Sequence, residues 1–172
     1  MKSIIPAFLF LAVGLSTLHA QTALPLGASY DIGFSPGGSA LAVVEKTISA
    51  AKSEILVACY EFTSREIAVA LEDDAQRGVK VRIVADWKAS RDRNSEVAAL
   101  ENAGIAVRLD RRYAIEHDKF MVIDGVDVET GSFNYTSAAV QRNAENALVL
   151  WNVPQMATVY AEEWERMWEE SK

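Results

Sequence analysis

Residues 117 to 134 gather five side chains whose types and spacing suit chemistry on a phosphate ester. The segment follows the pattern H-x-K-x4-D-x6-G-S-x-N, and the side chains it specifies are His117, Lys119, Asp124, Ser132 and Asn134. A neutral imidazole can attack phosphorus, and a lysine can offer positive charge to a non-bridging phosphate oxygen. A hydroxyl and an amide add hydrogen-bond donors. The set could stabilise a pentacoordinate transition state without a metal ion or another cofactor.

Two pairs in this segment have the spacing that brings side chains to one face of a strand. His117 and Lys119 are two residues apart, and so are Ser132 and Asn134. On a strand, residues i and i+2 point the same way, so each pair can reach one ligand. Gly131 permits the backbone to approach closely at that point.

A hairpin is predicted between the two pairs. Asp124-Gly125 is a strong signal for a tight turn, and it lies between the segments 120–123 and 126–130, which it would join as two strands. On turn chemistry alone Asp124 is an ordinary turn residue. Judged without the rest of the motif, a structural and a functional role for it are equally good interpretations.

Strands alternate with helices over the first two-thirds of the chain. Apolar periodicity and turn residues predict strands at 29–34, 54–60, 79–85 and 105–109, and helices at 41–51, 64–77 and 93–103. Beyond the hairpin they predict a short helix at 137–142, a strand at 147–151 and a last helix from 154 to about 170. This order predicts an α/β fold, a layered sandwich with a mixed, mainly parallel central sheet flanked by helices on both faces.

The first twenty residues have the layout of a secretory signal peptide. Lys2 is followed by an apolar run and by Leu18-His19-Ala20, with a cut expected after Ala20. Residues 21–172 would then form a single domain in the periplasm or outside the cell, with no stable membrane association after cleavage. The leader contains one lysine and no acidic residue. The chain after the leader would therefore have 16 basic and 24 acidic side chains, a net charge of −8. Any groove that binds nucleic acid must therefore be locally basic.

Cys59 is the only cysteine, and it lies in the apolar run 55–60. An intrachain disulfide is impossible, and a buried, small apolar role is expected. One cysteine and one histidine outside the leader cannot make an ordinary zinc site within one chain.

The pattern of residues 117 to 134 resembles the HKD signature of the phospholipase D superfamily. All specified positions match, which makes the motif specific. The resemblance covers about 29–151 and is closest to the small bacterial Nuc-type endonuclease branch. The segments that carry it beyond the motif are Phe34-Ser35-Pro36, Ala51-Lys52, Tyr60-Glu61-Phe62-Thr63-Ser64, Ala70-Leu71 and residues 77–84.

The resemblance implies a role for each site residue. His117 would attack phosphorus and form a phosphohistidine, while Lys119 and Asn134 would bind non-bridging oxygens. Ser132 would support the site by hydrogen bonding. Asp124 would be mainly structural or would tune a neighbouring charge. Glu145, which matches a downstream acid of the family, would orient the histidine and fix its tautomer.

The motif occurs once, although the family mechanism uses two histidines on opposite sides of the phosphorus. One imidazole cannot be nucleophile and general acid in the same step. The 152 residues after the leader leave no room for a second such domain. The resemblance therefore implies a homodimer in which two copies of His117 share one active site.

The expected substrate is nucleic acid, DNA or RNA, bound with low sequence specificity. Arg111 and Arg112 lie just before His117 and could hold a phosphate backbone, unless they pair with Asp110 and Glu116. A phospholipase D-type hydrolase or transferase acting on phospholipid is the alternative, because the motif does not separate the two. A non-catalytic nucleic-acid-binding module is a third interpretation, which the intact motif disfavours.

Overall fold

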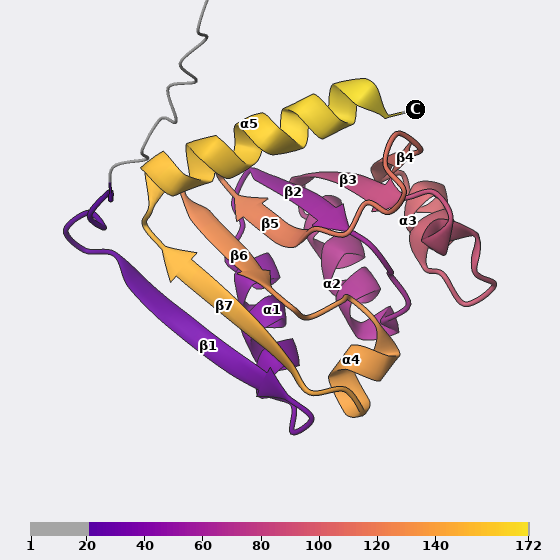
Figure 1. The fold of residues 1–172 in the computed structure, drawn as a ribbon, viewed down its shortest axis with the longest axis horizontal. Helices are drawn as coiled ribbons and strands as arrows, with labels where there is room; N and C mark the ends of the chain where they lie inside the picture. Colours follow the sequence, from indigo (N-terminus) through magenta and orange to yellow (C-terminus); the bar gives the residue numbers. More distant parts are fainter. Residues whose placement is uncertain (1–20, 172) are drawn as a thin grey trace, which may run out of the picture.

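A computed structural model describes residues 21 to 171, which form one seven-stranded sheet with helices packed against it (Figure 1). The predicted signal peptide lies outside the described residues. The strands are β1 (Ser29–Ser35), β2 (Glu54–Cys59), β3 (Lys80–Asp86), β4 (Ala106–Asp110), β5 (Lys119–Ile123), β6 (Asp127–Gly131) and β7 (Glu145–Trp151). The helices are α1 (Ser39–Ser49), α2 (Arg65–Gln76), the short 3-10 helix η1 (Ala89–Arg91), α3 (Val97–Asn102), α4 (Ser137–Gln141) and α5 (Pro154–Glu170).

The sheet confirms the α/β class and the mixed pairing, but the expectation of mainly parallel pairing is wrong. The strand order is β1-β7-β6-β5-β2-β3-β4. Of the six pairings among the described strands, only β2–β3 and β3–β4 are parallel. Helical crossovers do make β1 to β4 run in one direction. The chain then returns through β5, β6 and β7 as an antiparallel meander, which inserts between β1 and β2.

Helices cover the two faces of the sheet unequally (Figure 1). On one face α1 and α2 pack over a large core that includes Cys59, which is fully buried as expected. On the other face α5 lies across β2 to β6, and its Trp164 is fully buried. The Trp164 indole nitrogen donates to the Val57 carbonyl at 2.8 Å. Burial of an aromatic side chain of this size is worth about 3 kcal/mol, so it anchors the helix.

The local signals in the sequence differ in how well they predicted the elements. Ser64 caps α2 as predicted, its hydroxyl accepting from the Ile67 amide. The helix predicted at 93–103 is shorter, because residues 93–96 form a polar loop that follows η1 and α3 begins only at Val97. In that loop the Asp92 carboxylate accepts the Asn94 amide at 2.8 Å, a local bond that competes with helix formation.

The predicted hairpin joins β5 to β6, and its turn fixes Asp124. Asp124 and Gly125 have φ of 53° and 66°, both in the left-handed region, and the Val126 amide donates to the Ile123 carbonyl at 3.0 Å to close the turn. The Asp124 carboxylate accepts the backbone amides of Lys52, Ser53 and Glu54 at 2.8 to 2.9 Å, and the Ser53 hydroxyl at 2.7 Å. Burial opposes ionisation, yet these hydrogen bonds outweigh it and lower the pKa of Asp124. The turn is thereby attached to the start of β2.

Replacing Asp124 with alanine should therefore destabilise the fold. The substitution leaves three backbone amides without their charged acceptor and puts a residue with no side-chain hydrogen bond at positive φ. We expect the free energy of unfolding to fall by about 2 to 4 kcal/mol. Urea unfolding followed by circular dichroism measures this loss. Asp124→Asn keeps one acceptor, so its free energy of unfolding should lie between those of the wild type and Asp124→Ala. An unfolding midpoint of Asp124→Ala equal to that of the wild type would contradict this role.

A second buried carboxyl, Glu129 on β6, should make stability depend on pH. Burial raises the pKa of Glu129 to about 8, against the hydrogen bond that the Tyr135 hydroxyl donates to it at 2.7 Å. Below about pH 4.5 both folded and unfolded chains hold the proton. Between about pH 4.5 and 8 only the unfolded chain releases it, so folding loses stability as pH rises, by at most about 1.4 kcal/mol per pH unit.

Glu129→Gln removes this titration and keeps an acceptor for Tyr135. Relative to the wild type, the variant should gain stability steadily as pH rises from about 5 to 8. Denaturant titrations of both proteins across this range give the difference directly. A difference that is the same at every pH would show that Glu129 does not remain protonated in the folded protein.

Candidate active site

The predicted site residues, with one exception, lie at the same end of the sheet. The register places Cys59, the last residue of β2, opposite Lys119, the first of β5. It also places Gly131, the last residue of β6, opposite Ala147 near the start of β7. The loops that leave β2 and β6 and those that enter β5 and β7 therefore meet at this end. We call it the site end of the sheet.

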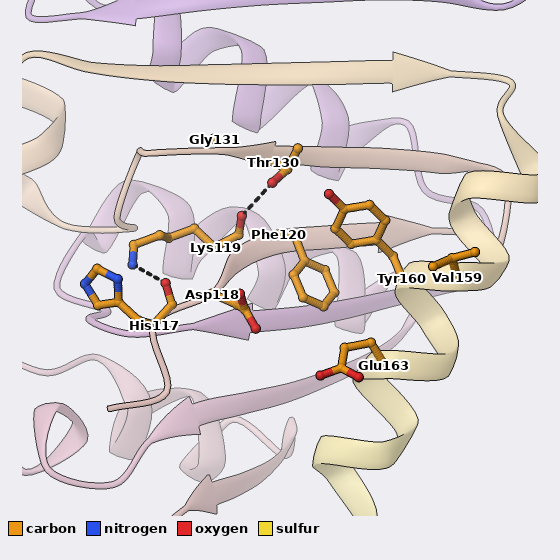
Figure 2. A pocket seen from close by; sticks show the side chains of 9 residues that line it. All are labelled: His117, Asp118, Lys119, Phe120, Thr130, Gly131, Val159, Tyr160 and Glu163. Carbon is orange, nitrogen blue, oxygen red and sulfur yellow. Dashed lines mark hydrogen bonds between the residues drawn. The ribbon is translucent and has the colours of Figure 1, made fainter. Parts of the chain in front are cut away.

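His117 and Lys119 share a neighbour that was not identified from the sequence, Tyr60. The Tyr60 and His117 ring centroids are 4.9 Å apart, and the Lys119 ammonium lies 5.4 Å from the Tyr60 centroid. The ammonium also donates to the His117 carbonyl (Figure 2). A tyrosine placed directly after the buried strand β2 was the available signal. It orients the imidazole by contact and stabilises the cation through its ring face.

Lys119 is a buried cation whose charge is supported by nearby acids. Its exposed fraction is 8%. Burial lowers its pKa, whereas the charges of Glu116, Asp118 and Glu145 act to raise it. A partly desolvated cation interacts more strongly with a phosphate oxygen than one in water does.

Ser132, Asn134 and Glu145 form the other side of the site. The Ser132 hydroxyl donates to the Glu145 carboxylate at 2.6 Å and accepts the Asn146 amide at 3.1 Å. The second Glu145 oxygen accepts from the Asn143 side chain at 3.2 Å. Among the described residues, Glu145 thus has hydrogen bonds to Ser132 and Asn143 and none to His117.

Asn134 and Gly131 are held by close backbone packing. Asn134 precedes Tyr135, whose carbonyl accepts the amides of Thr63 and Ser64 at 2.9 Å, so Asn134 lies beside the loop that leaves β2. The Asn134 side-chain oxygen is buried with no hydrogen-bond partner among the described residues. A Cβ atom on Gly131 would lie 2.2 Å from the Asn146 carbonyl oxygen. The close approach predicted at Gly131 is therefore real, and it is an approach to β7.

Asp124 is the exception, because it lies at the opposite end of β5. It follows the last residue of β5, whereas Lys119 is the first. At about 3.3 Å per residue the two are separated by roughly 16 Å. Its carboxylate serves the hairpin and the start of β2, which is the structural role that the family resemblance implied for it.

The two arginines predicted to bind phosphate have different surroundings. Arg112 forms an ion pair with Glu170 of α5 at 3.0 Å, and not with Asp110 or Glu116. Arg111 has its guanidinium 4.7 Å from the Trp87 ring centroid and no ion pair among residues 21–171. Of the two, only Arg111 has a guanidinium free to meet a ligand.

The segment before His117 is fixed by two buried acids, which the sequence did not indicate. The Asp86 carboxylate accepts the amides of Ala89 at 2.8 Å and Glu116 at 3.0 Å. The Glu116 carboxylate accepts the Asp118 amide at 3.1 Å. Burial, followed by the neighbouring Asp118 charge, raises the pKa of Glu116 to about 8. These contacts hold the backbone on both sides of His117.

A cleft opens between the His117 end of β5 and helix α5 (Figure 2). His117 and Lys119 lie at one end of it, and Tyr160 and Glu163 of α5 lie at the other. The lining residues are His117, Asp118, Lys119, Phe120, Thr130, Gly131, Val159, Tyr160 and Glu163.

Residues 21 to 171 include neither a helix long and apolar enough to cross a bilayer nor a group of three metal-ligating side chains.

Comparisons with known proteins agree with this geometry. Residues 44–168 match the family model for the PLD-like domain of cardiolipin synthase. The structure is similar to Nuc, a phospholipase D family member from Salmonella typhimurium, with a TM-score of 0.82 and 41% identity over 84% of this chain and 97% of that one. It is also similar to NucT from Helicobacter pylori, with a TM-score of 0.77 and 26% identity over 84% and 98% of the two chains.

A curated relative indicates a second kind of substrate. The chain is 34% identical over 132 residues to the mitochondrial cardiolipin hydrolase of Mus musculus, which covers 77% of this chain and 59% of that protein. The chain therefore spans a little over half of the length of that relative. The family match, the fold and the position of the HKD residues at one end of the sheet lead to one conclusion: the chain belongs to the phospholipase D superfamily, in its Nuc-type branch.

Proposed function

We propose that the protein is a metal-independent nuclease that cleaves phosphodiester bonds of DNA or RNA at a site shared by two subunits. The observation that carries this proposal is the His117–Lys119 pair, held against Tyr60 at the mouth of a cleft. An imidazole nitrogen of His117 attacks phosphorus, and the bond to the leaving oxygen breaks. Lys119 and Asn134 stabilise the charge on the non-bridging oxygens. Water then attacks the phosphohistidine and releases a phosphate monoester and free histidine.

The leaving oxygen needs a proton, and His117 is the only histidine in residues 21–171. It cannot supply that proton while it acts as nucleophile. We assign the proton donor to His117 of a second copy of the chain. That histidine also activates the water in the second step. A twofold axis close to the site satisfies both requirements.

The face that a second copy would cover lies next to the cleft. Tyr30, Ile32 and Phe34 of β1 have exposed fractions of 68%, 50% and 57%. Ile32 pairs with Leu148, which pairs with Thr130 of the cleft lining, so one row of side chains runs from the cleft to the sheet edge. Helix α5 packs on β2 to β6 and leaves β1 and β7 uncovered. Apolar surface of this kind beside an incomplete site fits a second copy of the same chain.

Phospholipid is the second candidate substrate, because the mouse relative is named a cardiolipin hydrolase. The chemistry at phosphorus would be the same. Nucleic acid is the stronger candidate here for two reasons. The structure matches Nuc and NucT over 97% and 98% of their chains, and helix α5 beside the cleft carries Glu162 and Glu163, which an anionic bilayer would repel.

The first test is plasmid digestion in excess EDTA by the wild type and by His117→Ala. We expect the wild type to nick and degrade the plasmid, and His117→Ala to lose more than about a thousandfold in rate, because the nucleophile is absent. Asp124→Asn, at the far end of β5, is the matched control, and its activity should follow its folded fraction. Phosphatidylcholine vesicles containing cardiolipin serve as the competing substrate.

Two results of this test would overturn the proposal. Wild-type activity that disappears in EDTA and returns with zinc or magnesium would exclude the metal-independent mechanism. Hydrolysis of cardiolipin without cleavage of DNA or RNA would assign the protein to the phospholipid substrate.

The shared site is tested with mixed dimers of wild type and His117→Asn, prepared by refolding equal amounts together. If both histidines are needed, only wild-type homodimers act, and activity falls to about a quarter of that of the wild type alone. Independent subunits would retain about half. The measurement is the initial rate of plasmid nicking at constant total protein.

Ile32→Glu provides the control for the interface. It puts a charge into the exposed row on β1, so we expect a monomer by light scattering with native circular dichroism and little activity. A fully active monomer would exclude the shared site.

A further inference from the structure

The arginines of this acidic protein divide into two groups. All ten lie within the described residues. Five form ion pairs with carboxylates, and Arg108 donates to the Trp168 carbonyl at 2.6 Å. The ion-paired arginines are Arg65, Arg77, Arg82, Arg112 and Arg166. The remaining four, Arg91, Arg93, Arg111 and Arg142, have neither an ion pair nor a side-chain hydrogen bond among residues 21–171.

All four of these arginines lie at the site end of the sheet. Arg91 and Arg93 are in the loop that leaves β3, and Arg111 follows β4 directly. Arg142 follows α4, three residues before β7 begins. Because β3 and β4 run parallel to β2 and β7 starts beside the end of β6, these positions surround the end that holds His117. Positive charge without an internal partner is thus concentrated where a phosphate would arrive.

Trp87 organises two of them. The guanidinium carbons of Arg91 and Arg111 lie 5.0 and 4.7 Å from the centroid of its ring. Stacking on an aromatic face leaves the in-plane N–H groups of a guanidinium free, and those groups bind phosphate in pairs. The acid nearest in sequence, Asp92, accepts the Asn94 amide. Two cations fixed near one indole, without a neutralising carboxylate, form a site prepared for an anion.

The Trp87 group is connected to the nucleophile by short, rigid links. The Trp87 amide donates to the Asp110 carbonyl at 3.0 Å, and the Lys88 ammonium donates to the Ala114 carbonyl at 3.2 Å. The neighbouring Asp86 carboxylate holds the Glu116 amide. Through Asp86 and Glu116 the Cα atoms of Trp87 and His117 are at most about 16 Å apart. A strand whose phosphate is at His117 can therefore place another phosphate of the same strand at Trp87.

We propose that Trp87, Arg91 and Arg111 form a subsite that binds a phosphate of the nucleic-acid strand next to the scissile one. This inference rests on the proposed nuclease function and extends it to a named binding track. Trp87 is the positioning residue, and the two arginines are the phosphate ligands. Arg93 and Arg142, on either side, extend the positive surface.

The arrangement favours a polymer over a membrane. A nucleic-acid strand presents phosphates at fixed intervals along a line, so two guanidiniums held on one ring match a neighbouring phosphate. A bilayer is a broad anionic surface, and it would also meet Glu163, which lines the cleft. Aromatic and guanidinium groups beside a basic track are the usual surface for single strands.

The experiment measures binding of a labelled single-stranded oligonucleotide by fluorescence anisotropy. Both proteins carry His117→Ala so that the strand survives, and one of them also carries Arg91→Ala and Arg111→Ala. Loss of two phosphate contacts should weaken binding roughly tenfold or more at about 50 mM salt. It should also lower the slope of log K against log salt by about 1.4.

The matched control is Lys52→Ala with Lys80→Ala, which removes the same charge from the opposite end of the sheet. Both side chains are exposed, and the control should keep the wild-type slope. Trp87→Leu, which retains both arginines, should weaken binding by a smaller factor and leave the slope close to that of the wild type. Melting temperatures of all variants confirm that they are folded.

The outcomes separate this inference from the proposed function. If the wild type cleaves no nucleic acid in EDTA, the proposed function fails. If the wild type cleaves it but the Arg91/Arg111 variant keeps the affinity and salt slope of its parent, the subsite fails alone. An equal fall of the slope in the Lys52/Lys80 control would also overturn it, since net charge would explain the effect. If the Arg91/Arg111 variant binds the oligonucleotide as its parent does but binds vesicles of phosphatidylcholine with cardiolipin less tightly, the surface would be reassigned to lipid.

Discussion

The site depends on the register of β5, which is fixed at both of its ends by carboxylates that accept backbone amides. At the far end Asp124 binds the amides that lead into β2, and at the site end Asp86 binds the amide of Glu116. A slip of one residue would turn every β5 side chain to the opposite face of the sheet. Lys119 would then leave Tyr60, and the imidazole would lose its support. The Asp124 carboxylate is therefore necessary for the geometry of His117 and Lys119, the two residues to which we assign the chemistry.

Electrostatics at the site end follow from the same arrangement. Burial lowers the pKa of Lys119, whereas the charges of Glu116 and Asp118 act to raise it. An arriving phosphate adds a further negative charge at this end of the sheet. Because the chain has a net charge of −7, binding of a phosphate is favourable only near arginines that form no ion pair within the protein. The four such arginines at the site end provide this condition, and the ion-paired ones elsewhere do not.

The sequence predicts turns, caps and individual strands, which depend on neighbouring residues. It does not predict the contacts that depend on which strands pair and in which register. Asp124-Gly125 predicts the hairpin, Ser64 the start of α2 and the apolar alternation most of the strands. The HKD spacing predicts that His117, Lys119, Ser132 and Asn134 act together. Nothing in the sequence shows that β5 to β7 insert between β1 and β2, because strand order is set by long-range packing. For the same reason the contacts of Tyr60 with His117, of Asp86 with Glu116, and of Trp87 with two arginines were found only in the structure.

The apolar side chains exposed on β1 lie next to the site, and the site contains a single histidine. Both features concern the same region of the molecule. A domain of this size could cover β1 and β7 with one more helix, as α5 covers the rest of that face. No helix within residues 21–171 does so, and Tyr30, Ile32 and Phe34 are exposed. A helix from the same chain would remove the exposed surface but could not provide a proton donor for the leaving oxygen. The second copy of the chain that we propose would remove the exposed surface and bring a second His117 at the same time, so one interface would satisfy both the packing and the chemistry.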